Sequence, residues 1–274
     1  MNRISVKDCI SDRPFVLLPF FRDGKPLDFG PRWGMTLRKA GSMRFRWNET
    51  NENRASVLAS VCGEKSPVPL ELIHSREVFA LENATDTQGK TGDGMITVNR
   101  TLVPVVTVAD CMPIFLFDEK SGVFGACHSG WKGTGIIADA IALAREEYGA
   151  HPEDICVAMG PHIHDCCYAV DGERAKYFAE NFTPDCVRRS EDKNGKAQYQ
   201  LSLEKANLAV LLRAGIQERN IVAAEDCTCC AQDVHGDFPF GSFRRQAAFL
   251  PKPLTVEERS KCMTVQAAFC GWLS

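Results

Sequence analysis

Three side chains in this 274-residue chain stand out, because they lie in dense local motifs and are of the types that bind a transition metal or that form a nucleophile with its base. Cys111 lies in TVADCMPIFLFD, His128 lies in GACHSGWKG, and His74 lies upstream in LELIHSREVF. One thiolate and two imidazoles can hold zinc at three positions and leave the fourth open for chemistry. A thiol beside an imidazole can also act as a nucleophile with its general base. The residue types alone leave both chemistries open.

The segments around Cys111 and His128 have the pattern of two adjacent strands. Residues 104–118 form an apolar run rich in Val, Ile and Phe, which predicts one buried strand, and residues 123–128 predict a second. In a hairpin of these strands, Cys111 and His128 lie roughly opposite each other on one face, with Cβ atoms about 4.5–5.5 Å apart. A bulge at Gly122 would shift the register by one residue and move one side chain to the other face.

Both residues are predicted to lie where regular pairing stops. Pro113 follows Cys111 closely and cannot donate to a strand ladder, and Gly130 ends the second strand soon after His128. Side chains at such ends can face a cleft. Lys132 follows between two glycines, where it can meet a phosphate as a point charge.

The remaining pattern predicts an α/β or α+β fold with a mixed sheet, because helical and strand-like segments mix along the chain. Helical spacing covers Ile136–Tyr148, with Gly149 just past its end, and residues 203–214 before Gly215. Further strands are predicted at residues 154–159, Ile221–Ala224 and residues 263–269.

Composition and charge indicate which partners the protein can bind and in which cellular compartment it is expected. A net charge of −3 gives no basic excess for nucleic acid or an anionic membrane. No stretch of about 18 apolar residues predicts a membrane span, and the first ten residues lack the apolar run of a signal peptide. The 13 cysteines are therefore expected to be mostly free thiols in a reducing, cytoplasmic compartment. The C-x-C-C order of residues 227–230 is not a usual zinc spacing, and the adjacent pair 166–167 is predicted to be structural.

The paired motifs around Cys111 and His128 resemble the core motifs of the laccase-domain family. Its members also carry the names purine nucleoside phosphorylase, polyphenol oxidase and peptidoglycan-editing factor. Further segments resemble family motifs in the same order along the chain: GMTLRKAGSM (34–43), Asn53 with Arg54, GDGMIT (92–97), GPHIHDCCYAV (160–170), CTCC (227–230) and SFRR (242–245).

This resemblance implies one domain over residues 1–274, folded as a mixed-sheet α/β sandwich with a site facing a cleft. It implies a Zn²⁺ ion, or alternatively Cu²⁺, held by His74, Cys111 and His128. The chain departs from the family pattern beside the first ligand, where Leu72 and Ser75 replace the family's Gln and Gly.

The resemblance also implies an activity: phosphorolysis of adenosine, inosine and S-methyl-5′-thioadenosine, with hydrolytic deamination of adenosine. The partners would be a purine nucleoside and phosphate. Arg38, Lys132 and Arg245 are the cations at matched positions, and Arg38 and Arg245 are favoured over Arg244 as bidentate phosphate ligands. Asp93 is predicted to orient a ligating histidine or to cap a turn.

Three other functions remain open at this point. A metal-free cysteine hydrolase would use Cys111 as nucleophile and His128 as base. A copper-dependent polyphenol oxidase is disfavoured, because a multi-copper cluster consumes many imidazoles and the chain has six histidines. A non-catalytic quality-control factor would bind a cell-wall precursor or a nucleotide. The pattern predicts no particular oligomeric state.

Overall fold

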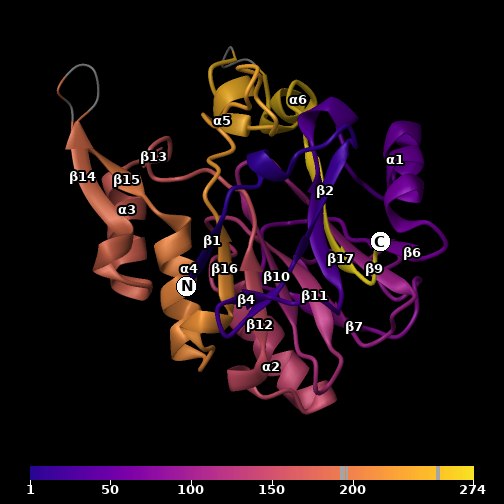
Figure 1. The fold of residues 1–274 in the computed structure, drawn as a ribbon. Coiled ribbons are helices and arrows are strands. Elements are labelled where there is room, and N and C mark those ends of the chain that lie inside the picture. The colour runs from indigo at the N-terminus through magenta and orange to yellow at the C-terminus, as the bar shows by residue number, and fades with distance from the viewer. Residues whose placement is uncertain (192–194, 196, 251–253) are drawn as a thin grey trace.

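Two large β-sheets form the centre of the computed structural model, which describes residues 1–191, 195, 197–250 and 254–274 (Figure 1). The larger sheet has seven strands in the order β1 (Asn2–Ile4), β16 (Ile221–Ala224), β12 (Cys156–Met159), β10 (Met112–Phe117), β11 (Phe124–Ser129), β8 (Gly94–Thr97) and β7 (Val78–Leu81). The second has five strands in the order β2 (Phe15–Pro19), β5 (Arg32–Thr36), β17 (Gln266–Gly271), β9 (Leu102–Val108) and β6 (Ser66–Pro69). Both sheets mix parallel and antiparallel pairs.

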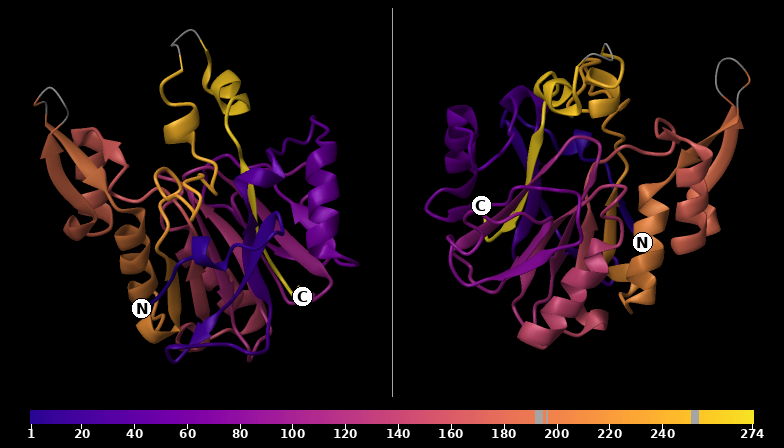
Figure 2. Two further views of the ribbon diagram at one scale, coloured as in Figure 1. Left: turned by 45° about the horizontal axis from the view of Figure 1, so that its top comes forward. Right: turned by 180° about the vertical axis from the view of Figure 1, so that it is seen from behind.

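Two smaller sheets and the helices surround this centre. The small sheets are β13 (Ala169–Val170), β15 (Ala197–Leu201) and β14 (Val187–Glu191), and the pair β3 (Phe21–Arg22) and β4 (Lys25–Pro26). The helices are α1 (Glu52–Cys62), α2 (Ile136–Tyr148), α3 (Gly172–Asn181), α4 (Leu203–Arg213), α5 (Phe243–Gln246) and α6 (Val256–Lys261). Figure 2 shows α3 and the β14–β15 hairpin extending to one side of the two large sheets. Within the described ranges, no helix has the length and hydropathy needed to cross a bilayer.

Successive side chains of a strand such as β10 point to opposite faces of the sheet, so apolar residues on both faces build a core on each side. Phe115 is buried between the two large sheets, where its ring stacks on Trp33 at a centroid distance of 5.5 Å. Ile114 belongs to the core on the other face of the larger sheet, together with Ile137 of α2. Helix α1 covers the outer face of the five-stranded sheet, where Leu58 belongs to a buried cluster with Val105 and Phe269. These layers confirm the predicted mixed-sheet α/β sandwich.

The prediction of one continuous strand over residues 104–118 is wrong. This apolar run forms two strands, β9 and β10, which belong to different sheets. Between them Asp110 has φ of 82°, a left-handed conformation that interrupts a ladder. Its carboxylate accepts hydrogen bonds from Thr228 Oγ1 at 2.7 Å and from the Arg244 backbone at 2.6 Å. Contacts with distant segments therefore hold the kink that apolar periodicity does not reveal.

The predicted pairing of β10 with β11 has the right partners and the wrong register. The strands are antiparallel, but His128 lies opposite Pro113 rather than opposite Cys111. A shift of two residues keeps side chains on the same face, because the side-chain period of a strand is two. Cys111 and His128 therefore stay neighbours, although they are not directly opposed.

Other elements lie where the pattern predicts them. Helix α2 spans Ile136–Tyr148, and Gly149 caps it in the left-handed region with φ of 66°. Strand β16 has the predicted bounds, whereas α4 ends at Arg213, one residue before the predicted end. These segments carry their signals locally, in apolar spacing and in the glycine that ends a helix.

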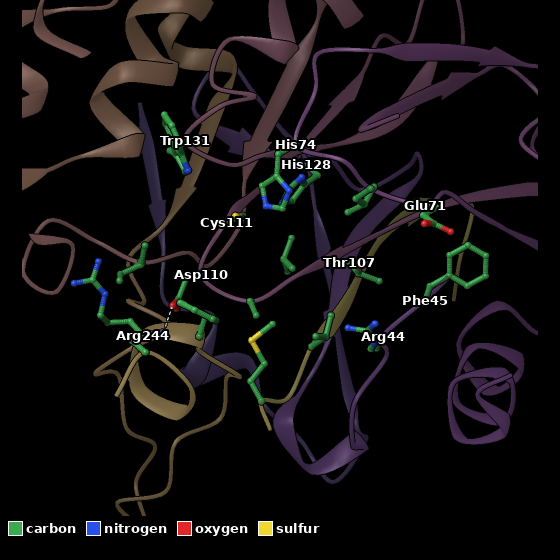
Figure 3. A pocket seen from close by; sticks show the side chains of 18 of the residues that line it. Arg44, Phe45, Glu71, His74, Thr107, Asp110, Cys111, His128, Trp131 and Arg244 are labelled. Carbon is green, nitrogen blue, oxygen red and sulfur yellow. Dashed lines mark hydrogen bonds between the residues drawn. The ribbon is translucent and has the colours of Figure 1, made fainter. Parts of the chain in front are cut away.

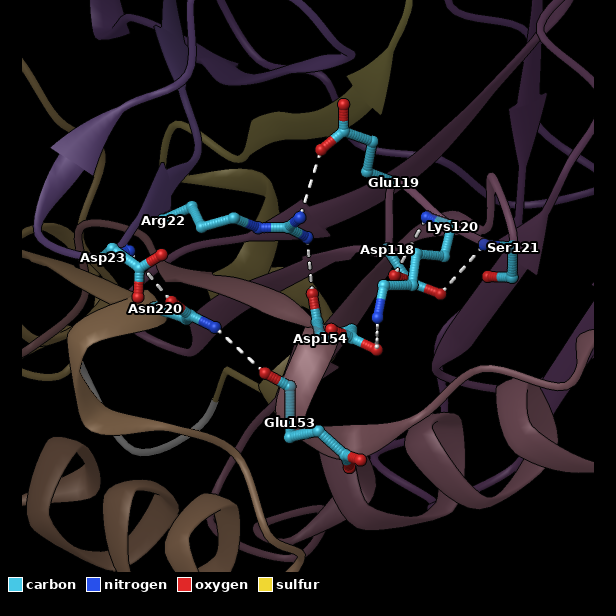
Figure 4. Close-up of polar contacts among 9 residues, drawn as sticks. All are labelled: Arg22, Asp23, Asp118, Glu119, Lys120, Ser121, Glu153, Asp154 and Asn220. Carbon is cyan, nitrogen blue, oxygen red and sulfur yellow. Dashed lines mark hydrogen bonds and ion pairs between the residues drawn. The ribbon is translucent and has the colours of Figure 1, made fainter.

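A polar network closes the turn of the β10–β11 hairpin at the end away from Cys111 and His128 (Figure 4). The Asp118 carboxylate accepts hydrogen bonds from the backbone of Lys120 at 3.2 Å and of Ser121 at 3.0 Å. Lys120 Nζ pairs with Asp154 Oδ2 at 2.7 Å, and Arg22 donates to the Asp154 carbonyl at 2.7 Å. The turn is thus tied to the segment before β12.

Candidate metal centre

His74, Cys111 and His128 converge at one place, as Figure 3 shows. Each offers one ligand atom, and these three atoms lie within 4.8 Å of one another. The residues come from the loop between β6 and β7, the kink before β10, and strand β11. The two imidazole rings meet edge to face with centroids 4.8 Å apart. His74 is exposed, Cys111 is half-buried and His128 is buried, so the group opens to the surface on the His74 side.

Gly130 leaves the space between these three side chains free. A Cβ at this position would lie 2.9 Å from His74 Cδ2 and 3.0 Å from Cys111 Sγ. It would also lie 3.5 Å from His128 Cε1. A gap lined by one sulfur and two imidazoles fits a zinc-like ion with three protein ligands. The donor set and the gap together are compatible with a metal ion.

Asp93 connects the two histidines. Its carboxylate is fully buried, and Oδ1 lies 2.8 Å from His128 Nδ1. Oδ1 also accepts from the His74 backbone at 3.0 Å, while Oδ2 accepts from the Ser75 backbone at 2.6 Å and from its hydroxyl at 2.7 Å. With Nδ1 engaged, His128 presents its other ring nitrogen to the site. Ser75, which replaces the family's glycine, thus adds a hydrogen bond to the support of the site.

The backbone is strained beside the candidate ligands. Among the described residues, three that are not glycine have positive φ, and two of them are His74 (60°) and Asp110 (82°). Such conformations persist only where surrounding contacts hold them, and they concentrate at functional sites. Asp93 holds His74, and Thr228 and Arg244 hold Asp110.

The electrostatics favour a thiolate at Cys111. Burial opposes its ionisation, but the neighbouring His128 and His74 outweigh burial and lower the pKa of Cys111 from 9.0 to about 6. Burial likewise opposes the charged form of His128, yet Cys111 and Asp93 raise its pKa from 6.5 to about 10. Both shifts favour the charged forms, a thiolate beside an imidazolium. The thiolate is the form that binds metals and attacks electrophiles.

A cavity of about 1040 Å³ lies over this group. His74, Cys111 and His128 line it together with aromatic and basic side chains (Figure 3). The aromatic residues are Phe45, Trp131, Tyr168, Phe243 and Phe249. The basic residues are Arg44, Arg46, Arg174 and Arg244. Apolar walls with a few charged groups are typical of small-molecule sites.

The three cations predicted to bind phosphate do not line this cavity. Arg245 donates to the carbonyls of Thr228 and Cys229, both at 2.8 Å, and to the carbonyl of Phe240. Its guanidinium thus secures a turn instead of facing the cavity. Lys132 is exposed with Nζ over the Trp131 ring, and Arg38 is exposed as well. Their matched motif positions do not bring these side chains into the cavity.

Two other arginines occupy the cavity wall near Cys111. The Arg174 guanidinium lies 4.3 Å from the Trp131 ring centroid, and its buried Nε has no hydrogen-bond partner. Arg244 lies 5.6 Å from the Tyr168 ring centroid and donates to the Ala169 carbonyl at 3.1 Å. No local motif marks Arg174, which reaches the cavity only through the placement of α3. Arg244 is next to Arg245, the predicted phosphate ligand. Because both lie in the helical turn α5, their side chains point in different directions.

The pattern of the multi-copper polyphenol oxidoreductase laccase family matches residues 46–248, and the chain belongs to this family. Two curated relatives bear enzyme names. The purine nucleoside phosphorylase YlmD of Geobacillus stearothermophilus is 33% identical over 142 residues, which cover 51% of this chain and 52% of the relative. The adenosine deaminase RL5 of an unknown prokaryotic organism is 36% identical over 140 residues, covering 50% and 53%. The chain spans about half the length of these relatives.

Solved structures have the same fold. The crystal structure of YlmD from Geobacillus stearothermophilus superposes with a TM-score of 0.75 at 24% identity, covering 96% of this chain and 97% of that one. The hypothetical protein YfiH of Bacillus licheniformis gives a TM-score of 0.71 at 23% identity, covering 88% and 92%. At these identities the likeness concerns the fold alone.

Proposed function

We propose that this chain is a zinc-dependent purine nucleoside phosphorylase acting on adenosine, inosine and S-methyl-5′-thioadenosine, with adenosine deamination as a side activity. The names of its relatives support a nucleoside-processing enzyme. The observation that carries the proposal is the convergence of His74, Cys111 and His128 on the surface of a cavity with aromatic walls. These three residues would hold the ion, which when bound would supply Lewis-acid polarisation of a substrate oxygen.

Phosphorolysis needs a phosphate held beside the ribose. A phosphate oxygen bonds to C1′, the bond from C1′ to the purine nitrogen breaks, and the purine takes the proton that hydrogen phosphate releases. Arg174 and Arg244 line the same cavity as Cys111 and can bind phosphate in a bidentate manner. Trp131 and Tyr168 offer aromatic faces beside them, and Asp93 holds the orientation of His128. We propose these residues, in place of Arg38, Arg245 and Lys132, as the substrate-binding set.

A second candidate function is a metal-free cysteine hydrolase. The chain of contacts from Asp93 to His128 to Cys111 is that of a nucleophile, a base and an orienting carboxylate. The low pKa of Cys111 also suits a nucleophile. In that mechanism His74 would only help to lower the pKa of Cys111, whereas its ligand atom lies within 4.8 Å of the other two, as a third metal ligand requires. For this reason we favour the metal.

The deciding experiment joins metal content to turnover. Purified protein is incubated with adenosine and phosphate, and adenine release is measured beside elemental analysis. We expect His74→Ala to lose one equivalent of zinc together with the activity, and zinc to restore activity to chelated wild type. His151→Ala, an exposed histidine elsewhere, serves as the matched control. Activity that survives chelation and the His74 substitution, but not Cys111→Ser, would identify the hydrolase instead.

A further inference from the structure

Four cysteines outside the cavity site gather from two distant segments. Cys166 and Cys167 lie between β12 and β13, and Cys227 and Cys230 follow β16. Their four sulfurs lie within 4.8 Å of one another. The spacing of Cys227 and Cys230 is C-x-x-C, a metal-binding spacing that the intervening Cys229 conceals in the sequence. Cys229 does not belong to the group.

Two of the sulfur separations match the edge of a coordination tetrahedron. Cys166 Sγ lies 3.7 Å from Cys230 Sγ and 3.8 Å from Cys167 Sγ. A tetrahedron of sulfurs with zinc–sulfur bonds of about 2.3 Å has edges of about 3.8 Å. A disulfide would require about 2.05 Å between the two sulfurs. These two separations equal a tetrahedral edge, and all four sulfurs lie within 4.8 Å of one another.

The backbone holds the two segments together independently of any ion. Cys227 forms an isolated parallel bridge with His162, and the Thr228 amide donates to the His162 carbonyl at 2.9 Å. The amide of His164 points at Cys227 Sγ with a separation of 3.4 Å. The donor group is therefore preorganised.

We propose that Cys166, Cys167, Cys227 and Cys230 bind one zinc ion as a structural site separate from the cavity site. Four protein ligands complete a tetrahedral shell and leave no open position for substrate. Cys166 and Cys230 are exposed, so an ion can enter from the surface.

The position of this cluster indicates a structural role at the cavity wall. Thr228 lies between two of the ligands and donates to Asp110 at 2.7 Å, and Tyr168, next to Cys167, lines the cavity. Zinc at this cluster would fasten the wall of the cavity to the turn after β16. It would thereby stabilise the kink that presents Cys111.

Elemental analysis of paired variants tests the site. In the His74→Ala/Cys111→Ala double variant, which lacks two ligands of the cavity site, we expect one zinc equivalent to remain. Adding Cys230→Ser should remove that equivalent, whereas adding Cys229→Ser, in the same turn, should leave it in place. Equal zinc content in the two triple variants, whether zero or one, would overturn the proposal.

A measurement on the wild-type protein guards against variants that fail to fold. Native zinc-loaded protein is treated with iodoacetamide before and after chelation, and labelled peptides are identified by mass spectrometry. We expect Cys166 and Cys230 to be protected until the ion is removed, while exposed Cys9 and Cys262 react at once. Immediate labelling of Cys166 and Cys230, or a disulfide-linked peptide pair joining them, would contradict the proposal. Neither experiment depends on nucleoside turnover, so the proposed function can fail without affecting this result.

Discussion

At the scale of single residues, the candidate centre depends on one buried carboxylate. Asp93 has no exposed surface and accepts hydrogen bonds from the loop at His74, from Ser75 and from the His128 ring. A buried carboxylate must be compensated by donors, and here those donors are the groups that carry the candidate ligands. Burial opposes the charged form of Asp93, but the hydrogen bond and charge of His128 and the hydrogen bonds from Ser75 together outweigh burial and lower the pKa of this carboxyl.

Asp93→Asn tests this role. The amide keeps the shape, but its NH₂ group faces donors on Ser75 or His128 and leaves at least one of them unpaired. We expect zinc affinity to fall roughly 10- to 100-fold, the range found for residues that orient metal-binding histidines. Competition with a chromophoric chelator measures the affinity. Asp86→Asn, which alters a half-buried loop carboxylate outside the site, is the control, and equal affinities in the two variants would argue against the role.

Gly130→Ala tests whether the gap between the ligands is needed. The added methyl would lie 2.9 Å from the His74 ring, closer than real Cβ contacts allow, and 3.0 Å from the Cys111 sulfur, a tight contact. We expect zinc content to fall well below that of wild type while the circular dichroism spectrum is retained. Gly172→Ala provides a matched control, since its methyl would meet Tyr199 at an ordinary 3.5 Å. Full zinc occupancy in Gly130→Ala would show that the ion does not occupy this gap.

At the scale of elements, the site is made where one apolar segment changes sheets. Strand β9 ends at Val108 in the five-stranded sheet, and β10 begins at Met112 in the seven-stranded sheet. The residues between them cannot continue either ladder, so Cys111 is free to face the cavity. The hairpin of β10 and β11 then sets His128 beside it, and the polar network at the far turn holds that hairpin in place.

The ion pair at this far turn makes a pH-dependent prediction. A hydrogen bond from Lys120 lowers the pKa of Asp154 below its ordinary 3.8. A lowered folded-state pKa means that the pair stabilises the fold above about pH 3.8, and that this contribution is lost as the pH falls through the lowered pKa. Lys120→Met should raise the titration midpoint of Asp154. The NMR chemical shift of the Asp154 carboxyl carbon, recorded as a function of pH, measures this midpoint. Lys65→Met, at a half-buried lysine that donates to the Arg100 carbonyl instead, should leave it unchanged, and an unmoved midpoint in Lys120→Met would refute the pairing.

At the scale of the whole molecule, the cavity depends on how two sheets pack. Phe115 projects from β10 into the core between the sheets and stacks on Trp33 of β5. The same strand begins one residue after Cys111. Packing between the sheets therefore fixes the distance from the thiol to the cavity wall that comes from the other sheet.

Phe115→Ala should accordingly destabilise the protein. Removing a fully buried ring from this core is expected to lower the free energy of unfolding by about 3–5 kcal/mol, because transfer and cavity terms add. Urea unfolding followed by fluorescence measures this difference. Val234→Ala, at a side chain that is 89% exposed, should change it by less than about 0.5 kcal/mol. A comparable loss in both variants would mean that Phe115 does not hold the sheets together.

The tertiary structure decided which distant groups meet. The placement of α3 brings Arg174 into the cavity, and backbone carbonyls turn Arg245 away from it. The segments after β12 and β16 bring two cysteine pairs together that the sequence separates by about sixty residues. None of these contacts leaves a local signal, because each depends on where an element packs and not on its own spacing.

The sequence by itself determined the features that local physics encodes. Apolar spacing and a capping glycine define α2, and the apolar run of Ile221–Ala224 defines β16. The motifs around Cys111 and His128 identify the donors of the candidate centre and the family. The apolar run of residues 104–118 did not reveal its kink, since a left-handed Asp110 is stable only with Thr228 and Arg244 beside it. Short-range propensity acts within a turn of chain, whereas register, cavity walls and the cysteine cluster arise from contacts made after the chain has folded.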